Sequence, residues 1–195
     1  MKGDDMGTAA ALSSRKEPES MGFHLRKPGL EDGHAIWALV KETGVLDVNS
    51  AYLYLLLTRD FAETCVVAEY EGSLLGFVTG FIRPTSPDCL FIWQVGVNAE
   101  SRGAGLAGRM LVHLLRRGTA RNIRFLETTV TASNRASIRL FDKLAESLGT
   151  EICRDEGFGA ELFPGDGHEA EDLYRIGPFN IFRQSPERTQ EKELF

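Results

Sequence analysis

The chain has little of what marks secreted, metal-binding or membrane proteins. It contains only three cysteines, Cys65, Cys89 and Cys153, and none of them has the C-x-x-C spacing of a zinc or redox site. No apolar run reaches the roughly 18 residues of a membrane span, and the apolar stretch at residues 9–12 is too short for a signal peptide. These absences predict a cytoplasmic protein with reduced thiols, no metal and no membrane contact.

Positive charge is also scarce. The 195 residues carry 22 Lys and Arg against 28 Asp and Glu, which gives a net charge of -6 at pH 7. Because there is no basic stripe to neutralise phosphates, we expect no nucleic-acid partner. The acidic balance fits a small cationic substrate.

Length and periodicity predict one domain between two tails. A chain of this size suits a single core, and it has no internal repeats. Residues 1–21 and 184–195 lack periodic apolar positions, so we expect mobile tails and a domain at 22–183.

Strands and helices alternate within that domain. Strands are predicted at 23–26, 64–70, 73–82, 90–97, 124–131, 151–154 and 172–176. Helices are predicted from Pro28, at 51–58 with Ser50 as N-cap, after residue 102, and from 134 to about 148. The glycine-rich stretch 155–170 is a candidate lid.

The most informative segment is the glycine-rich turn at residues 102–107. It follows an apolar strand and opens a helix whose apolar residues share one face: Leu106, Met110, Leu111, Leu114 and Leu115. A strand, turn and helix of this kind point free backbone N–H groups and the positive end of the helix dipole at one spot. We therefore expect a phosphorylated cofactor.

Three cofactor motifs compete for this turn. A P-loop is excluded because no Lys follows a glycine at the required spacing. The glycines of Gly103-x-Gly105-x-x-Gly108 match the Rossmann fingerprint, and Glu127 lies about 20 residues on, where a ribose-binding acid is expected. Residues 98–102 separate the strand from the first glycine, however, and Glu127 lies inside its own strand. Both details argue against a dinucleotide site.

The third motif is a coenzyme A turn. Arg102-x-x-Gly105-x-Ala107 resembles the turn of the GCN5-related N-acetyltransferase (GNAT) family, and Asn134-x-x-Ser137-x-x-Leu140-Phe141 resembles a second helix of that family. The resemblance covers about 23–180 and implies an α/β fold of mixed α+β type, with a central twisted mixed sheet flanked by helices. It also implies acetyl-CoA as cosubstrate. The implied cofactor-binding residues are Val95, Val97, Arg102, Gly103, Ala104, Gly105, Leu106, Ala107, Asn134 and Ser137.

Further segments narrow the resemblance. Residues 46–54, 93–95, 126–131 and 168–171 together are similar to the branch that acetylates the 4-amino group of L-2,4-diaminobutyrate for ectoine synthesis. We therefore expect the amine to attack the thioester directly, without an acetyl-enzyme.

A diamino acid carries two ammonium groups and one carboxylate, so its pocket needs anionic or aromatic groups and a hydrogen-bond donor. The candidate substrate-binding residues are Asp47, Asn49, Ser50, Tyr52, Trp93, His168 and Glu171. Plainer roles stay open for several of them. Asp47 and Ser50 fit helix-cap positions, and His168 fits a solvated loop. Trp93 fits core packing, because alternation does not fix which face of its strand it occupies.

The amine must lose a proton before it attacks, because an alkylamine titrates near ~10.4. The candidate bases, in order, are Glu171, His168 and Glu127. A backbone N–H near Val95 is the family's usual donor to the developing oxyanion. The family's thiolate-protonating Tyr is replaced by Phe141, so we predict that Tyr52, another hydroxyl or water takes this role.

Two other functions remain open at this stage. One is an acetyltransferase of the same fold for another amine, such as a polyamine, an aminoglycoside or a peptide N-terminus. The other is a non-catalytic acyl-CoA-binding module. We also expect a homodimer, because several apolar residues near the C-terminus need burying: Phe158, Leu162, Phe163, Phe179, Ile181 and Phe182.

Overall fold

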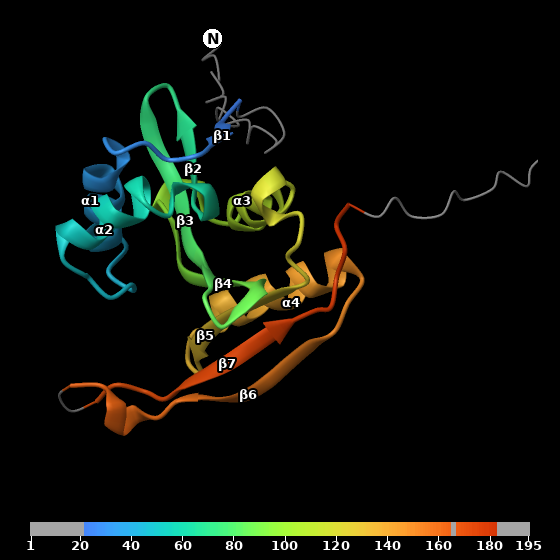
Figure 1. Ribbon diagram of the computed structural model, residues 1–195. Coiled ribbons are helices and arrows are strands. Elements are labelled where there is room, and N and C mark those ends of the chain that lie inside the picture. Colours follow the sequence, from blue (N-terminus) through green and yellow to red (C-terminus); the bar gives the residue numbers. More distant parts are fainter. Residues whose placement is uncertain (1–21, 165–166, 183–195) are drawn as a thin grey trace, which may run out of the picture.

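The computed structural model describes residues 22–164 and 167–182 (Figure 1). Within them seven strands form one sheet: β1 (His24–Arg26), β2 (Val66–Tyr70), β3 (Ser73–Arg83), β4 (Ser86–Val97), β5 (Phe125–Thr131), β6 (Ile152–Phe158) and β7 (Glu171–Ile176). The α-helices are α1 (Asp32–Thr43), α2 (Ala51–Arg59), α3 (Leu106–Leu115) and α4 (Arg135–Leu148). The tails expected at 1–21 and 184–195 lie outside the described residues, so the bounds 22–183 stay a prediction.

The sheet is mixed, as the sequence predicted. Its strand order is β1-β2-β3-β4-β5-β7-β6, and every neighbouring pair is antiparallel except β4 with β5. The parallel pair extends only from Cys89 opposite Phe125 to Phe91 opposite Glu127. Among the described residues, the C-terminal part of β4, residues 92–97, has no strand partner on its β5 side. We call this short β4–β5 pairing the seam.

Helices cover both faces of the sheet (Figure 1). Successive residues of a strand point to opposite faces. Accordingly Val66 packs in the core under α3 and α4, whereas Val67 packs in the core under α1 and α2. On α3, Met110 and Leu111 are fully buried, which confirms the apolar face predicted from its spacing.

A β-bulge at Trp93 interrupts the alternation of β4. Thr79 of β3 pairs with Gln94, but the next residue, Gly80, pairs with Ile92, so Trp93 is the extra residue. As a result Ile92 and Val95 both face the α3–α4 core. Trp93 packs against the α1–α2 core instead. The bulge explains why alternation alone could not assign this side chain to a face.

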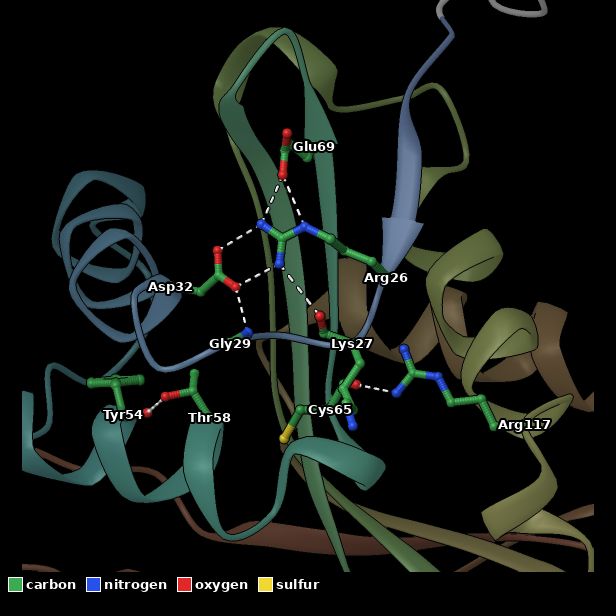
Figure 2. Close-up of polar contacts among 9 residues, drawn as sticks. All are labelled: Arg26, Lys27, Gly29, Asp32, Tyr54, Thr58, Cys65, Glu69 and Arg117. Atoms are coloured by element: carbon green, nitrogen blue, oxygen red, sulfur yellow. Dashed lines mark hydrogen bonds and ion pairs between the residues drawn. The ribbon is translucent and has the colours of Figure 1, made fainter.

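Helix α1 begins at Asp32 and not at Pro28, which corrects the predicted start. Asp32 is held by its carboxylate, which accepts hydrogen bonds from the Gly29 N–H at 2.7 Å and from Arg26 at 2.6 and 2.9 Å. Figure 2 shows the Arg26 guanidinium between Asp32 and Glu69. Burial alone would raise the pKa of Asp32, but these hydrogen bonds outweigh it and hold the pKa below its usual value.

Strand β6 is longer than the predicted 151–154, because it continues to Phe158 and pairs with β7. The register shifts between Asp155 and Phe158. A Cβ at Gly157 would lie 2.3 Å from the Glu171 carbonyl oxygen, so only glycine fits this close approach. The predicted lid at 155–170 therefore begins as strand, up to Phe158, and continues into a short 3-10 helix at Ala160–Leu162.

Candidate active site

A cavity of about 870 Å³ lies beside the seam. Its walls come from the end of β4, the turn before α3, the loop after α1, and the first two turns of α4. The volume falls within the roughly 300–1,000 Å³ of ligand sites. The cavity thus opens where β4 has lost its neighbour in the sheet.

The glycine-rich turn forms one wall of the cavity. Gly103 and Gly105 have φ angles of 81° and 72°, the left-handed region that favours glycine. Gly105 is the N-cap of α3, and the Arg109 N–H donates to its carbonyl at 3.1 Å. The N–H groups before Arg109 have no acceptor within the helix. The turn therefore has the free N–H groups at a helix start that an anion site needs.

The third glycine of the Rossmann fingerprint has no close packing to satisfy. A Cβ on Gly108 would meet nothing nearer than Leu140 Cδ1 at 3.9 Å, an ordinary contact. The single parallel strand pair also differs from the mostly parallel sheet of a dinucleotide-binding fold. Both observations agree with the sequence argument against that motif.

Most of the predicted cofactor residues line this cavity: Val95, Val97, Arg102, Gly103, Gly105, Leu106, Ala107, Asn134 and Ser137. Ala104 is exposed on the turn but is not part of the lining. Asn134 also has a structural role, because its Oδ1 accepts from the Ser137 N–H at 3.0 Å and caps α4.

Three cations on α4 were missed in the sequence. Arg135, Arg139 and Lys143 line the cavity at four-residue intervals, so they share one face of the helix. Among the described residues no carboxylate is paired with any of them. Their spacing was the available signal, and with Arg102 they make this cavity cationic in an acidic protein.

A second cluster joins segments far apart in the chain. Asp47 comes from the loop between α1 and α2, His168 from the loop before β7, and Glu171 from the start of β7. Their nitrogen and carboxylate oxygen atoms lie within 4.8 Å of one another. His168 Nε2 is 3.9 Å from Asp47 Oδ2. The structure thus brings together three predicted substrate residues.

Other contacts orient this cluster. The His168 ring stacks on Phe163 with 3.6 Å between ring centroids, and the Thr129 hydroxyl donates to Glu171. Two carboxylates beside one imidazole suit a cationic ligand. A group of this composition and spacing is also able to hold a metal ion.

The remaining substrate candidates are not gathered at this cluster. Asn49 donates to the Asp47 carbonyl at 3.2 Å. Ser50 occupies the N-cap of α2 without a side-chain hydrogen bond. Tyr52 is 65 % exposed and does not line the cavity. Trp93 is half-buried against the α1–α2 core.

Two buried polar residues were missed by sequence reasoning. The Tyr54 hydroxyl donates to Gln94 Oε1 at 3.0 Å, and Gln94 Nε2 donates to the Asp47 carbonyl at 3.0 Å. The available signal was a shift in the apolar pattern of β4, from Leu90 and Ile92 to Val95 and Val97.

Glu127, the third candidate base, is engaged elsewhere. It is buried and ion-paired with Arg83 of β3 and Arg175 of β7. Nearby, burial and the Glu127 charge raise the pKa of the Cys89 thiol to about 12, and burial raises that of Cys65 to about 11. Neither thiol is activated as a nucleophile. Among the described residues, no helix is both long enough and apolar enough to span a bilayer.

Comparison with known proteins adds independent support. The family model described as "Acetyltransferase (GNAT) family" matches residues 33–145. L-2,4-diaminobutyric acid acetyltransferase of Marinococcus halophilus is 51 % identical over 153 residues, which are 78 % of this chain and 88 % of the relative. The enzyme of the same name from Bordetella parapertussis is 44 % identical over 179 residues, 91 % of this chain and 96 % of the relative.

Solved structures agree. The diaminobutyrate acetyltransferase EctA from Paenibacillus lautus, in complex with its substrate L-2,4-diaminobutyric acid and coenzyme A, superposes with a TM-score of 0.80 at 42 % identity. The match covers 85 % of this chain and 99 % of that one. Ard1 from Thermoplasma volcanium, at 18 % identity and a TM-score of 0.63, shares the fold. The chain therefore belongs to the acetyltransferase (GNAT) family, within its L-2,4-diaminobutyric acid acetyltransferase branch.

Proposed function

We propose that this protein transfers the acetyl group of acetyl-CoA to the 4-amino group of L-2,4-diaminobutyrate. The product, N4-acetyl-L-2,4-diaminobutyrate, would serve ectoine synthesis. The observation that carries the proposal is the 42 % identical neighbour bound to diaminobutyric acid and coenzyme A, which covers 85 % of this chain. The cationic cavity and the anionic cluster around His168 are the two chemistries that such a pair of substrates needs.

The cavity supports acetyl-CoA as the cosubstrate. The free N–H groups of the turn at 102–107 suit its pyrophosphate, and the unpaired edge at Val95 and Val97 suits its pantetheine amides. The row of cations on α4 suits the remaining phosphate charge. No metal is part of this proposal.

The cluster supports the amino acid. Asp47, His168 and Glu171 would hold the ammonium groups. Trp93, half-buried against the α1–α2 core, is the proposed cation–π partner of the bound amine. Asn49, Ser50 and Tyr52, which follow Asp47 within five residues, are the candidate donors to the substrate carboxylate.

The reaction requires one proton to leave the amine. Glu171 or His168 accepts it, and the free amine attacks the thioester carbonyl carbon. The oxyanion that forms is stabilised by a backbone N–H near Val95, and its collapse breaks the C–S bond. The leaving thiolate takes a proton from Tyr52 or from water. Phe141 lies in the core, 2 % exposed, so it has no part in this step.

Thiol release from acetyl-CoA tests the assignment. The amines would be 2,4-diaminobutyrate, ornithine, lysine, putrescine and a peptide. We expect diaminobutyrate to be preferred by about tenfold or more in kcat/KM, roughly 1.4 kcal/mol of discrimination. Turnover of putrescine or the peptide without turnover of diaminobutyrate would overturn the substrate assignment. Binding of acetyl-CoA without any turnover would indicate a non-catalytic module.

A homodimer in the cytoplasm is a further part of the proposal. Phe158 is 49 % exposed and Leu162 is 66 % exposed on the β6–β7 hairpin, whereas Phe179 is buried. Exposed apolar groups of this size favour association. Sedimentation equilibrium should give twice the chain mass, and a single-chain mass would contradict the dimer.

A further inference from the structure

A buried chain of hydrogen bonds connects helix α2 to the loop that holds Asp47. Tyr54 is fully buried and Gln94 is 6 % exposed. Both the oxygen and the nitrogen of the Gln94 side-chain amide form hydrogen bonds. Its oxygen accepts from Tyr54, and its nitrogen donates to the backbone carbonyl of Asp47. Figure 2 shows Tyr54 on α2, one turn before Thr58.

The loop depends on this chain for its position. The Asp47 side chain is 82 % exposed, and its neighbours Val45 and Val48 are 78 % and 55 % exposed. Apart from Leu46, which packs against the α1–α2 core, little packing holds the segment. Between α1 and α2, among the described residues, Gln94 supplies the hydrogen bond from the sheet to this backbone. The carbonyl it holds belongs to the residue whose carboxylate faces His168.

An amide is required at this place. A carboxylate at residue 94 would accept from Tyr54 but would set an oxygen against the Asp47 carbonyl, and a hydrocarbon would serve neither partner. The bulge at Trp93 turns Gln94 toward α2, where it meets these partners. The β-bulge at Trp93 and the side-chain amide of Gln94 therefore act together to hold the Asp47 carbonyl.

We propose that Gln94 is a positioning residue that fixes the Asp47 carboxylate in the amine-binding cluster. It acts through the Asp47 backbone and touches neither substrate. This inference rests on the proposed function, since it assigns to Gln94 a role in recognising the diamino acid at that same site.

The direct test compares Gln94→Glu and Gln94→Leu with the wild type. Both variants should raise KM for diaminobutyrate by about tenfold and leave KM for acetyl-CoA within about twofold. Thr58→Val is the matched control, because it removes a buried hydrogen bond of the same helix, to the Tyr54 carbonyl at 2.9 Å, that does not reach the loop. It should leave both KM values unchanged, whatever it does to Tm.

A double-mutant cycle separates positioning from general loosening. In an Asp47→Ala background, Gln94→Glu should raise KM for diaminobutyrate by less than about twofold, since the carboxylate that it positions is gone. An undiminished effect in that background, or an equal rise of both KM values, would overturn the inference. If neither Gln94 variant folds, Tyr54→Phe replaces them. It should likewise raise KM for diaminobutyrate and leave KM for acetyl-CoA unchanged.

The wild-type control keeps the two proposals distinct. A wild type without preference for diaminobutyrate contradicts the proposed function. A selective wild type whose Gln94 variants retain its KM for diaminobutyrate contradicts only the role of Gln94.

Discussion

Glu127 shows how a carboxylate in a reactive-looking place is committed to structure. It lies buried on β5 with an arginine on either side, one from β3 and one from β7. Those arginines are 40 % and 37 % exposed in their side chains, so water reaches them, whereas Glu127 is 2 % exposed. The carboxylate therefore joins three strands of the sheet.

Replacing Glu127 by Gln should destabilise the protein and leave the chemistry intact. The amide weakens two charge-assisted hydrogen bonds, and we expect a loss of about 1–3 kcal/mol in the free energy of unfolding. Urea unfolding measures that loss. The kcat and the pH profile of folded enzyme should not change. A hundredfold fall in kcat at unchanged stability would instead make Glu127 the base.

The buried thiols predict a loss of stability in alkali. The pKa values of Cys65 and Cys89 are raised to about 11 and 12, above the value near 9 of an unfolded cysteine. Above pH 9 the unfolded chain loses protons that the folded protein keeps, so unfolding becomes easier as pH rises toward 11. We expect on the order of 1 kcal/mol per pH unit from each thiol.

Cysteine variants isolate this effect. Thermal unfolding from pH 8 to 11 should show a smaller decline in Cys65→Ala and Cys89→Ala than in the wild type. Cys153→Ser is the control, because Cys153 is exposed on β6 and should leave the decline unchanged. Identical declines in all four proteins would contradict the assignment.

Residue by residue, the sequence was informative where backbone conformation demands one amino acid. Gly103 and Gly105 were identified from their motif, and their positive φ explains why the motif needs glycine there. Gln94 was not, because its proposed role depends on a bulge and on partners 40 and 47 positions away. The meeting of Asp47 with His168 likewise depends on two loops, whose paths periodicity does not encode.

At the level of the elements, two glycine substitutions near the start of α3 test the role of the turn. Gly105→Ala places a Cβ in a left-handed conformation, which costs about 1–2 kcal/mol. The strain should also distort the anion site, so KM for acetyl-CoA should rise by about tenfold or more. Initial rates at varied acetyl-CoA measure this.

Gly108→Ala is the matched control one turn along. Gly108 lies within α3, and its added methyl has room. Alanine in a helix is favoured over glycine by about 0.5–1 kcal/mol, so stability should rise and KM for acetyl-CoA should stay the same. Equal damage by the two substitutions would show that the turn conformation is not what binds the cofactor.

Periodicity placed the helices and strands to within a few residues, but it did not fix the residues at which they begin and end. Helix α4 was placed correctly because its motif starts at Asn134, which in the structure caps the helix. The start of α1 was wrong because the Asp32 carboxylate is fixed by Arg26 and Gly29, a tertiary arrangement. The predicted β6 was too short because the later residues of this edge strand are exposed and lack an apolar pattern.

At the scale of the whole molecule, the seam divides the sheet into two parts. Strands β1 to β4 lie on one side and β5, β7 and β6 on the other, with three residue pairs between them. Asp47 belongs to the first part, and His168 and Glu171 belong to the second. The proposed amine-binding cluster therefore requires both parts in register.

Coenzyme A should tie the two parts together. At about 100 times its Kd, a ligand specific for the folded state adds about 2.7 kcal/mol to stability, and we expect Tm to rise by roughly 5–10 °C. Amide hydrogen exchange should slow most at residues 92–97 and at the turn. The β2–β3 hairpin serves as the internal reference, and uniform slowing over both regions would contradict binding at the seam.

The split sheet also bears on how the protein behaves in storage. An ordinary open sheet has free edges only at its two outer strands, but among the described residues here residues 92–97 also lack a neighbouring strand, in the interior of the sheet. Free edges are templates for pairing with another chain, and proteins commonly cover or charge them. In this molecule, coenzyme A bound in the neighbouring cavity would cover the free edge at residues 92–97. Concentrated enzyme stripped of coenzyme A should therefore aggregate sooner than enzyme kept saturated with it, and light scattering on ageing samples would record the difference.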